Sequence, residues 1–403
     1  MSTAIIIGSI SVVILLLVGV VLTLIFVPTF NINNGNNGTI TTTSCYNGDG
    51  PTNNQSALFR ATNHMCQTLW LEARSGVCGS PLPGYNTTLF KLDPGKSFDF
   101  NIPETGLPSA RFWAKYGCDE TGNNCLIGDQ VPIWTDTETC EYPYGCHFDT
   151  CPAGPAPTTG FTPPIDSLFE ITFGCSPDVE TTTCNVNSSA CTGGCNYFGC
   201  PNGGCDPLTP VTFFDTSQVD GWTLPYRYYV KGTASDLAMC NGGQGAQNIN
   251  ASTLSVGRCP TTENLSDNGQ YPTLNNIDLT SVDLRYIRNG QVVGCFAPCR
   301  KLTAPTSENG YSFAEGVYPV NWYCCPTPTP NNCQLPACVT PSECSSGPIV
   351  ETEYVTGVHE MAPGVYAYTY DDQLGSQNCP AGGSIVYELE FGGQNASPYP
   401  INA

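Results

Sequence analysis

Basic residues are scarce in this chain of 403 residues, which carries 13 Lys and Arg against 34 Asp and Glu. The formal net charge of −21 repels phosphate backbones and anionic lipid surfaces, and so excludes nucleic acid as a partner. A neutral polysaccharide is compatible with this charge, because sugar hydroxyls bind carboxylates and aromatic faces without needing a positive charge.

Several chemical signatures are also absent. The chain has no G-x-S-x-G elbow, no P-loop and no Cys/His nucleophile pair, which disfavours the hydrolases built on those motifs. It has only three His, and the cluster of Cys140, Cys146, His147 and Cys151 lacks the paired CxxC spacing of a zinc site. We therefore expect no metal and no cofactor.

Turn-forming residues are abundant in this chain, whereas charged residues are scarce. With 42 Gly, 34 Pro and only 12% charged residues, the composition favours short strands and many turns, which is typical of an all-β fold. At residues 385–391 apolar side chains alternate with glutamates, which predicts a half-buried antiparallel strand. Short runs at 111–116, 168–173 and 227–230 predict further strands, arranged as two packed sheets joined by long loops.

The 24 cysteines indicate a disulfide framework formed in an oxidising compartment. Seven N-x-S/T sequons agree with that placement, either as glycosylation sites or as chance products of an Asn- and Thr-rich sequence. The sequon residues are Asn37, Asn54, Asn86, Asn187, Asn250, Asn264 and Asn395.

An uncharged run covers residues 4–27, and its 24 residues exceed the roughly 20 that cross a bilayer as a helix. It lacks the basic n-region and short apolar core of a signal peptide, so residues 1–28 are interpreted as a retained transmembrane anchor in the lipid bilayer, with a cleaved signal peptide as the alternative. The Asn-, Gly- and Thr-rich residues 29–55 follow as a flexible stalk. Because the cysteines require oxidation, we expect the N-terminus inside and the ectodomain, residues 56–398, extracellular, lumenal or on a virion surface.

Residues 213–225 place two carboxylates, Asp215 and Asp220, between a strand-like run and a Gly turn. Side chains alternate along a strand, so positions five apart point to opposite faces unless the chain bends between them. The residues between the two acids, and the Asp-Gly pair that ends the segment, favour such a bend.

The segment 215–225 reads DTSQVDGWTLP and resembles the signature of the thaumatin-like proteins. Other motifs of that family occur in the same order along the chain. They are FRATNHMCQTLW at 59–70, ARFWAKYGC at 110–118 followed by Cys125, PPIDSLFEI at 163–171, DLR at 283–285, YCC at 323–325 and VYAYTYDD at 365–372. The resemblance implies a thaumatin-like antiparallel β-sandwich with disulfide-rich loop regions. Here the pattern is enlarged by a cysteine-rich insertion at 175–209 and a second expansion at 232–278.

Three disulfides follow from the resemblance. They are Cys118 with Cys125, Cys299 with Cys324, and Cys325 with Cys333 or Cys338. The family's terminal Cys is absent near Gly392, so Cys66 must pair elsewhere, and Cys78 is the candidate.

The acidic cleft of the family carries over onto five positions of this chain. They are Arg111, Glu170, Asp215, Asp220 and either Asp371 or Asp372. Clustered carboxylates raise one another's proton affinity, so one can stay protonated while a neighbour is ionised beside Arg111. A glycosidase needs such a pair, and Glu170 is the candidate acid with Asp215 or Asp220 as its partner. The alternative is a cluster that binds sugar hydroxyls and cleaves nothing.

Aromatic residues accompany these acids. Trp222 follows Asp220, and Tyr366, Tyr368 and Tyr370 share one face of a predicted strand. Such rings can stack on sugar faces, although on sandwich strands they more often belong to the core.

Together these features predict a membrane-anchored, extracytoplasmic domain that binds a β-linked glucan such as β-1,3-glucan and is at most a slow endo-β-1,3-glucanase. The alternative is a structural surface glycoprotein of a cell envelope, spore or virion, which contacts envelope or capsid proteins and has no enzymatic activity. The long insertions and altered disulfides favour the alternative, whereas the complete acidic set favours glucan binding.

Overall fold

The structure is a computed structural model. It describes residues 58–74, 81–103, 106–128, 167–174, 211–314, 317–326, 339–371, 376–382, 384–392 and 401–402. All of these belong to one compact unit, Ser44–Ala403. The predicted anchor at 1–28, the stalk at 29–55 and the insertion at 175–209 lie outside the described residues. Within the described ranges, no helix combines the length and the apolar character needed to cross a bilayer.

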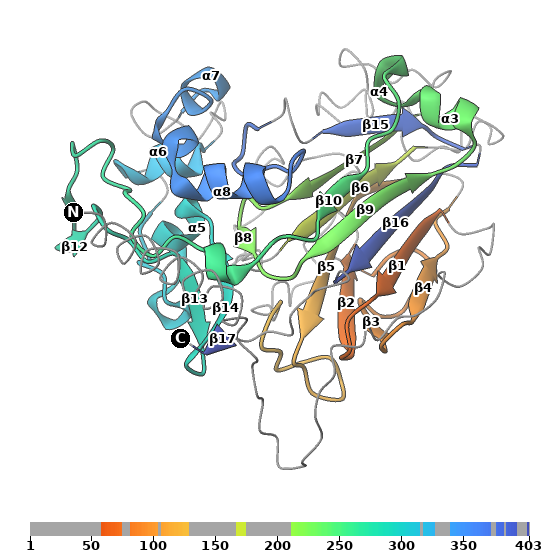
Figure 1. The fold of residues 1–403 in the computed structure, drawn as a ribbon, viewed down its shortest axis with the longest axis horizontal. Coiled ribbons are helices and arrows are strands. Elements are labelled where there is room, and N and C mark those ends of the chain that lie inside the picture. Colours follow the sequence, from red (N-terminus) through yellow and green to blue (C-terminus); the bar gives the residue numbers. More distant parts are fainter. Residues whose placement is uncertain are drawn as a thin grey trace, which may run out of the picture. The chain divides into compact units, whose positions relative to one another are not determined.

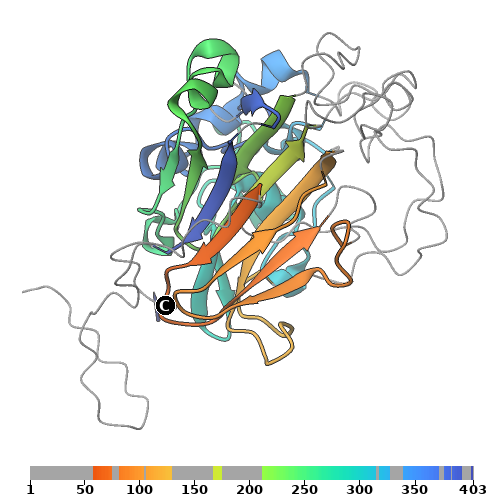
Figure 2. The same ribbon diagram turned by 90° about the vertical axis from the view of Figure 1, so that its right-hand side faces the viewer.

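The first main sheet has five strands in the order β10-β9-β16-β1-β4. Their bounds are Ile249–Ala251, Tyr226–Lys231, Val386–Phe391, Phe59–Asn63 and Ser97–Phe100. Strand β1 lies between β16 and β4, and it runs parallel to β16 but antiparallel to β4. Figure 2 shows β1 in red beside β16 in blue, so the first and last strands of the sandwich are neighbours.

The second main sheet has six strands in the order β15-β7-β6-β5-β2-β3, all antiparallel to their neighbours. Their bounds are Gln377–Pro380, Val211–Ser217, Leu168–Phe173, Leu107–Tyr116, Leu69–Arg74 and Leu89–Leu92. Figure 1 shows how the strands of the two sheets are arranged.

Aromatic side chains fill the space between the two sheets. The ring of Phe59 on β1 lies 4.2 Å from that of Phe112 on β5 and 5.2 Å from that of Phe169 on β6. On the neighbouring strands, the rings of Phe214 and Tyr387 lie 5.1 Å apart. Every second residue of a strand faces inward, so these alternating aromatics form one buried layer. The predicted two-sheet, disulfide-bonded β architecture is therefore present, with one parallel strand pair within it.

Strand β16 is more deeply buried than its sequence pattern predicts. Tyr387, Leu389 and Phe391 are buried as expected, but Glu388 on the other face is only 4% exposed. It pairs with Lys231 and accepts a hydrogen bond of 3.2 Å from Thr62. The half-buried pattern holds at Glu390, which is partly exposed, and departs at Glu388 because Lys231 on β9 and Thr62 on β1 engage its carboxylate.

Smaller elements extend from the end of β7. Strand β14 pairs with β13, β17 and β8, and a separate hairpin joins β11 to β12. The bounds are Gly221–Trp222 for β8, Thr273–Leu274 for β11, Ile277–Asp278 for β12, Arg285–Arg288 for β13, Gln291–Phe296 for β14 and Ile401–Asn402 for β17.

Short helices and disulfides complete the unit. The α-helices are α3 Ala234–Ala238, α4 Cys240–Gly243, α5 Pro298–Thr303, α6 Val320–Cys324, α7 Pro341–Cys344 and α8 Glu353–Met361. The 3₁₀ turns are η3 Val256–Arg258, η4 Thr306–Glu308 and η5 Pro348–Glu351. Two disulfides that the sequence did not suggest, Cys240–Cys379 and Cys259–Cys295, tie these loops to β15 and β14.

Two of the disulfides implied by the resemblance are present, Cys118–Cys125 and Cys299–Cys324. The third is wrong, because Cys325 bonds to Cys344 and not to Cys333 or Cys338. Helix α7 packs against η5 near α6 and holds the Cα of Cys344 5.8 Å from that of Cys325, within the usual range for a disulfide. Cys66 is disulfide-bonded, and its suggested partner Cys78 lies outside the described residues.

A buried carboxylate fixes the first turn of α8. Glu263 is 2% exposed and accepts hydrogen bonds from the backbone N–H groups of Tyr354, at 2.8 Å, and Glu353, at 3.2 Å. These donors have no partner within the helix, and a carboxylate at a helix N-terminus also interacts favourably with the helix dipole. Glu263 therefore anchors α8 to the segment between η3 and β11.

Replacing Glu263 by Gln is expected to change the pH dependence of stability. Burial raises the pKa of Glu263, although the Tyr354 and Glu353 donors oppose the rise. A raised folded-state pKa stabilises the fold below the unfolded pKa, and this contribution is lost as pH rises through the folded pKa. In urea unfolding, the free energy of the wild type minus that of Glu263→Gln should be largest in acid and shrink toward neutral pH. A difference that grows with pH contradicts this account.

Candidate functional site

Three adjacent strands bring Arg111, Glu170 and Asp215 into one line across the six-stranded sheet. Arg111 on β5 is directly opposite Glu170 on β6, and Glu170 is directly opposite Asp215 on β7. Because side chains alternate, this line lies on the face opposite to the aromatic layer. Directly opposed residues have Cβ atoms about 4.5–5.5 Å apart. We call these three residues the polar row.

An ion pair holds the polar row together. The Nε of Arg111 lies 2.6 Å from Oε1 of Glu170, and the two side chains are 30% and 29% exposed. Like charges directly opposite each other destabilise a sheet, so Glu170 and Asp215 would repel without a cation beside them. The negative charge of Glu170 raises the pKa of Arg111, burial opposes the rise, and Asp220 and Asp215 add to it. Arg111 is therefore the cation on which all three carboxylates act.

A turn brings Asp220 toward the polar row. Strand β7 ends at Ser217, and the N–H of Gly221 donates to the carbonyl of Gln218 at 3.1 Å. Gly221 has a φ of 139°, which favours glycine, and β8 then leaves the sheet to pair with β14. The predicted bend between the two Asp residues is thus present, and the charge of Asp220 reaches Arg111.

Trp222 belongs to the core and not to the substrate-binding set, so of the two roles open to it from the sequence the packing role is the correct one. Its side chain is 0% exposed and stacks on Tyr354 of α8 with ring centroids 4.9 Å apart. Its Nε1 donates to the carbonyl of Ser255 at 3.3 Å. Strand β8 lies close to α8 in Figure 1, and the Trp222–Tyr354 ring contact joins the two elements.

The tyrosines near residue 370 are also mostly buried. Tyr366 is 9% exposed and Tyr368 is 8% exposed. The segment consists of turns and one isolated bridge, not the predicted strand, because Tyr366 pairs only with Ser217 at the end of β7. These two rings therefore contribute to packing.

Asp371 is buried and holds a histidine. Its Oδ2 lies 2.7 Å from Nε2 of His359 on α8 and accepts a hydrogen bond of 2.9 Å from the N–H of Ala367. His359 therefore has a carboxylate partner supplied by the segment that follows α8. Asp372, the alternative member of the acidic set, lies outside the described residues.

Other sites predicted from the sequence fall partly within the described residues. These contain no cluster of three or more His, Cys, Asp or Glu with metal-binding geometry, and Cys140 to Cys151 lie outside them. Asn86, Asn250 and Asn264 are exposed, and the Oδ1 atoms of the last two accept hydrogen bonds of 2.6 Å from Ser252 and Ser266. The sequons at Asn37, Asn54, Asn187 and Asn395 lie outside the described residues, and glycosylation remains a prediction.

Similar proteins agree with the motifs. The chain is 25% identical over 341 residues to Thaumatin-like protein 1 of Pyrus pyrifolia, covering 83% of this chain and 91% of that protein. It is 24% identical over 301 residues to a glucan endo-1,3-beta-glucosidase of Prunus avium, covering 74% of this chain and 78% of that protein. These matches confirm the resemblance to thaumatin-like proteins over most of the chain.

No family model matches the chain. Among solved structures, the thaumatin-like xylanase inhibitor TLXI is 16% identical and covers 44% of this chain and 78% of its own, with a TM-score of 0.21, a value too low to bear on the fold.

Proposed function

We propose that this protein binds a β-linked glucan at the polar row, with Asp220 beside it. The observation that carries the proposal is the Arg111–Glu170 ion pair, with Asp215 directly opposite Glu170, on the solvent-accessible face of the six-stranded sheet. Carboxylates accept hydrogen bonds from sugar hydroxyls, and a guanidinium donates to their oxygens. One relative is named a glucan endo-1,3-beta-glucosidase, which supports a β-1,3-linked glucan as the ligand.

Binding is favoured over rapid hydrolysis. A glycosidase requires one protonated carboxyl to donate to the leaving oxygen. Oε1 of Glu170 lies 2.6 Å from Nε of Arg111, so this carboxyl is already engaged as an acceptor by a cation and is not placed as a free proton donor.

The location of the protein belongs to the same proposal. The disulfides favour an oxidising compartment, which supports an extracytoplasmic domain, and the uncharged run at 4–27 is the candidate anchor. A polysaccharide of an extracellular matrix or cell wall is the kind of ligand that such a domain would meet.

Sedimentation with insoluble β-1,3-glucan tests the proposal. The full chain should be retained, that is, it should sediment with the glucan. Glu170→Gln should weaken its affinity for the glucan by about ten-fold or more because a charged acceptor of the polar row is lost. Glu360→Gln is the matched control, since Glu360 pairs with Arg258 at the same 2.6 Å but is 56% exposed. Release of reducing sugar from laminarin, measured on the same proteins, reports any cleavage.

Failure of the wild type to be retained overturns the proposal and favours a structural surface protein. Equal retention of the wild type and Glu170→Gln overturns the assignment of the site. Thermal unfolding of each variant shows whether a loss of binding reflects a loss of fold.

A further inference from the structure

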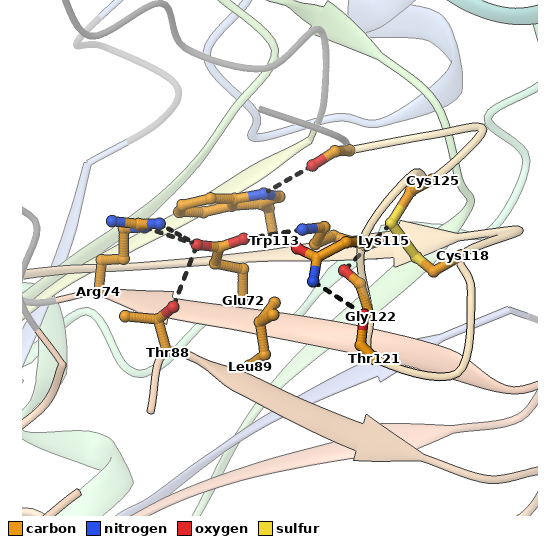
Figure 3. Close-up of polar contacts among 12 residues, drawn as sticks. Glu72, Arg74, Thr88, Leu89, Trp113, Lys115, Cys118, Thr121, Gly122 and Cys125 are labelled. Carbon is orange, nitrogen blue, oxygen red and sulfur yellow. Dashed lines mark hydrogen bonds and ion pairs between the residues drawn. A yellow bond between two sulfur atoms is a disulfide. The ribbon is translucent and has the colours of Figure 1, made fainter. Parts of the chain in front are cut away.

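A second charged cluster lies beside the polar row on the same sheet. Glu72 on β2 is 2% exposed, and Oε1 of its carboxylate accepts hydrogen bonds from Nε of Arg74 at 2.7 Å and from Oγ1 of Thr88 at 3.3 Å. The other oxygen lies 3.2 Å from Nζ of Lys115, which is itself 3% exposed. Figure 3 shows Glu72 between the two cations.

The register of β2 and β5 connects this cluster to the proposed site. Arg74 is directly opposite Arg111, so the two guanidinium groups occupy neighbouring positions in line with Glu170 and Asp215. Cations directly opposite each other repel, and both are attracted to the carboxylates of the polar row. Strands β2 and β6 are two intervals of about 4.8 Å apart, which is within the combined reach of an Arg and a Glu side chain.

We infer that Glu72 is a positioning residue for the glucan site: it holds Arg74 on its own strand and leaves Glu170 to pair with Arg111. This inference rests on the proposed function. Burying an unpaired charge is costly, and the buried Glu72 forms ion pairs with both Arg74 and Lys115. Without its negative charge, Arg74 is released toward Glu170, competes with Arg111 and occupies the acceptor that a sugar hydroxyl needs.

The test is a rescue experiment with the full chain and insoluble β-1,3-glucan. Glu72→Gln should weaken retention by about ten-fold, which corresponds to the loss of one charge-assisted contact. The double variant Glu72→Gln/Arg74→Gln removes the competing cation and should recover retention to within about three-fold of the wild type. A purely structural role predicts the opposite, with the double variant binding no better than Glu72→Gln.

A matched control separates general destabilisation from an effect on the site. Glu388 is also a buried glutamate paired with a lysine, Lys231, but it lies on the other sheet. Glu388→Gln should lower the melting temperature and leave the retention of folded protein unchanged. Equal losses of retention in Glu72→Gln and Glu388→Gln would overturn the inference.

A crystal structure of Glu72→Gln gives a readout that does not depend on glucan. Contact between the Arg74 guanidinium and Glu170 supports the positioning role, and an Arg74 that stays on residue 72 refutes it. If the wild type binds no glucan, the proposed function fails, and this structure still decides what Glu72 does.

Discussion

Replacing Arg111 by Met is expected to abolish glucan retention and to destabilise the domain by about 1–2 kcal/mol, because the Arg111–Glu170 pair is only partly buried and lies between the exposed and the buried cases. Glu170, Asp220 and Asp215 all act on this one guanidinium, in that order of strength. Without it, Glu170 and Asp215 are like charges directly opposite each other on neighbouring strands. Sedimentation with glucan and chemical unfolding measure the two effects.

Arg258→Met is the control for this prediction. Arg258 and Glu360 are also 2.6 Å apart, but their side chains are 53% and 56% exposed. Solvent screens such a pair, so its loss should cost less than about 0.5 kcal/mol and leave retention unchanged. Equal destabilisation by the two substitutions would show that the polar row gains nothing from its partial burial.

Removing the Cys240–Cys379 disulfide by a double Ala substitution is expected to give the largest loss of stability. The bond closes a loop of 139 residues and ties α4 to β15, an edge strand of the six-stranded sheet. Three other disulfides lie within this loop and shorten the free path between its ends, so the chain-entropy model gives about 4 kcal/mol for restricting the unfolded chain. The melting temperature of the variant, expressed under oxidising conditions, measures this loss.

The Cys118–Cys125 bond provides the comparison. It closes a loop of only 7 residues, for which the same model gives about 2 kcal/mol. The long-loop variant should therefore unfold at a clearly lower temperature than the short-loop variant. The reverse order would mean that local packing around each bond, and not loop length, decides its contribution.

The strand pattern was largely predictable from the sequence because it depends on local alternation. The motif ARFWAKYGC places Arg111 and Phe112 on opposite faces of one strand, and PPIDSLFEI does the same for Phe169 and Glu170. Only the register between the strands was missing, and the resemblance to thaumatin-like proteins supplied the expectation that these acids meet.

Features that depend on distant partners were not predictable. Trp222 follows the acidic segment, yet its environment is set by Tyr354 on a helix far along the chain. The partner of Cys325 depends on where α7 packs. Glu72 and Arg74 are two positions apart in LWLEAR and therefore share one face of the strand. Nothing in that strand alone shows that Arg74 lies opposite Arg111.

The place of β1 between β16 and β4 limits when the protein can fold. Thr62 on β1 and Glu388 on β16 are in hydrogen-bond contact although they are 326 positions apart. A nascent chain therefore leaves the ribosome with β1 long before β16 exists, and the five-stranded sheet cannot close until translation is nearly finished. Folding dominated by such distant contacts is slow and leaves strand edges exposed in the interim, so production of this protein should depend on chaperones and disulfide isomerases that act after synthesis.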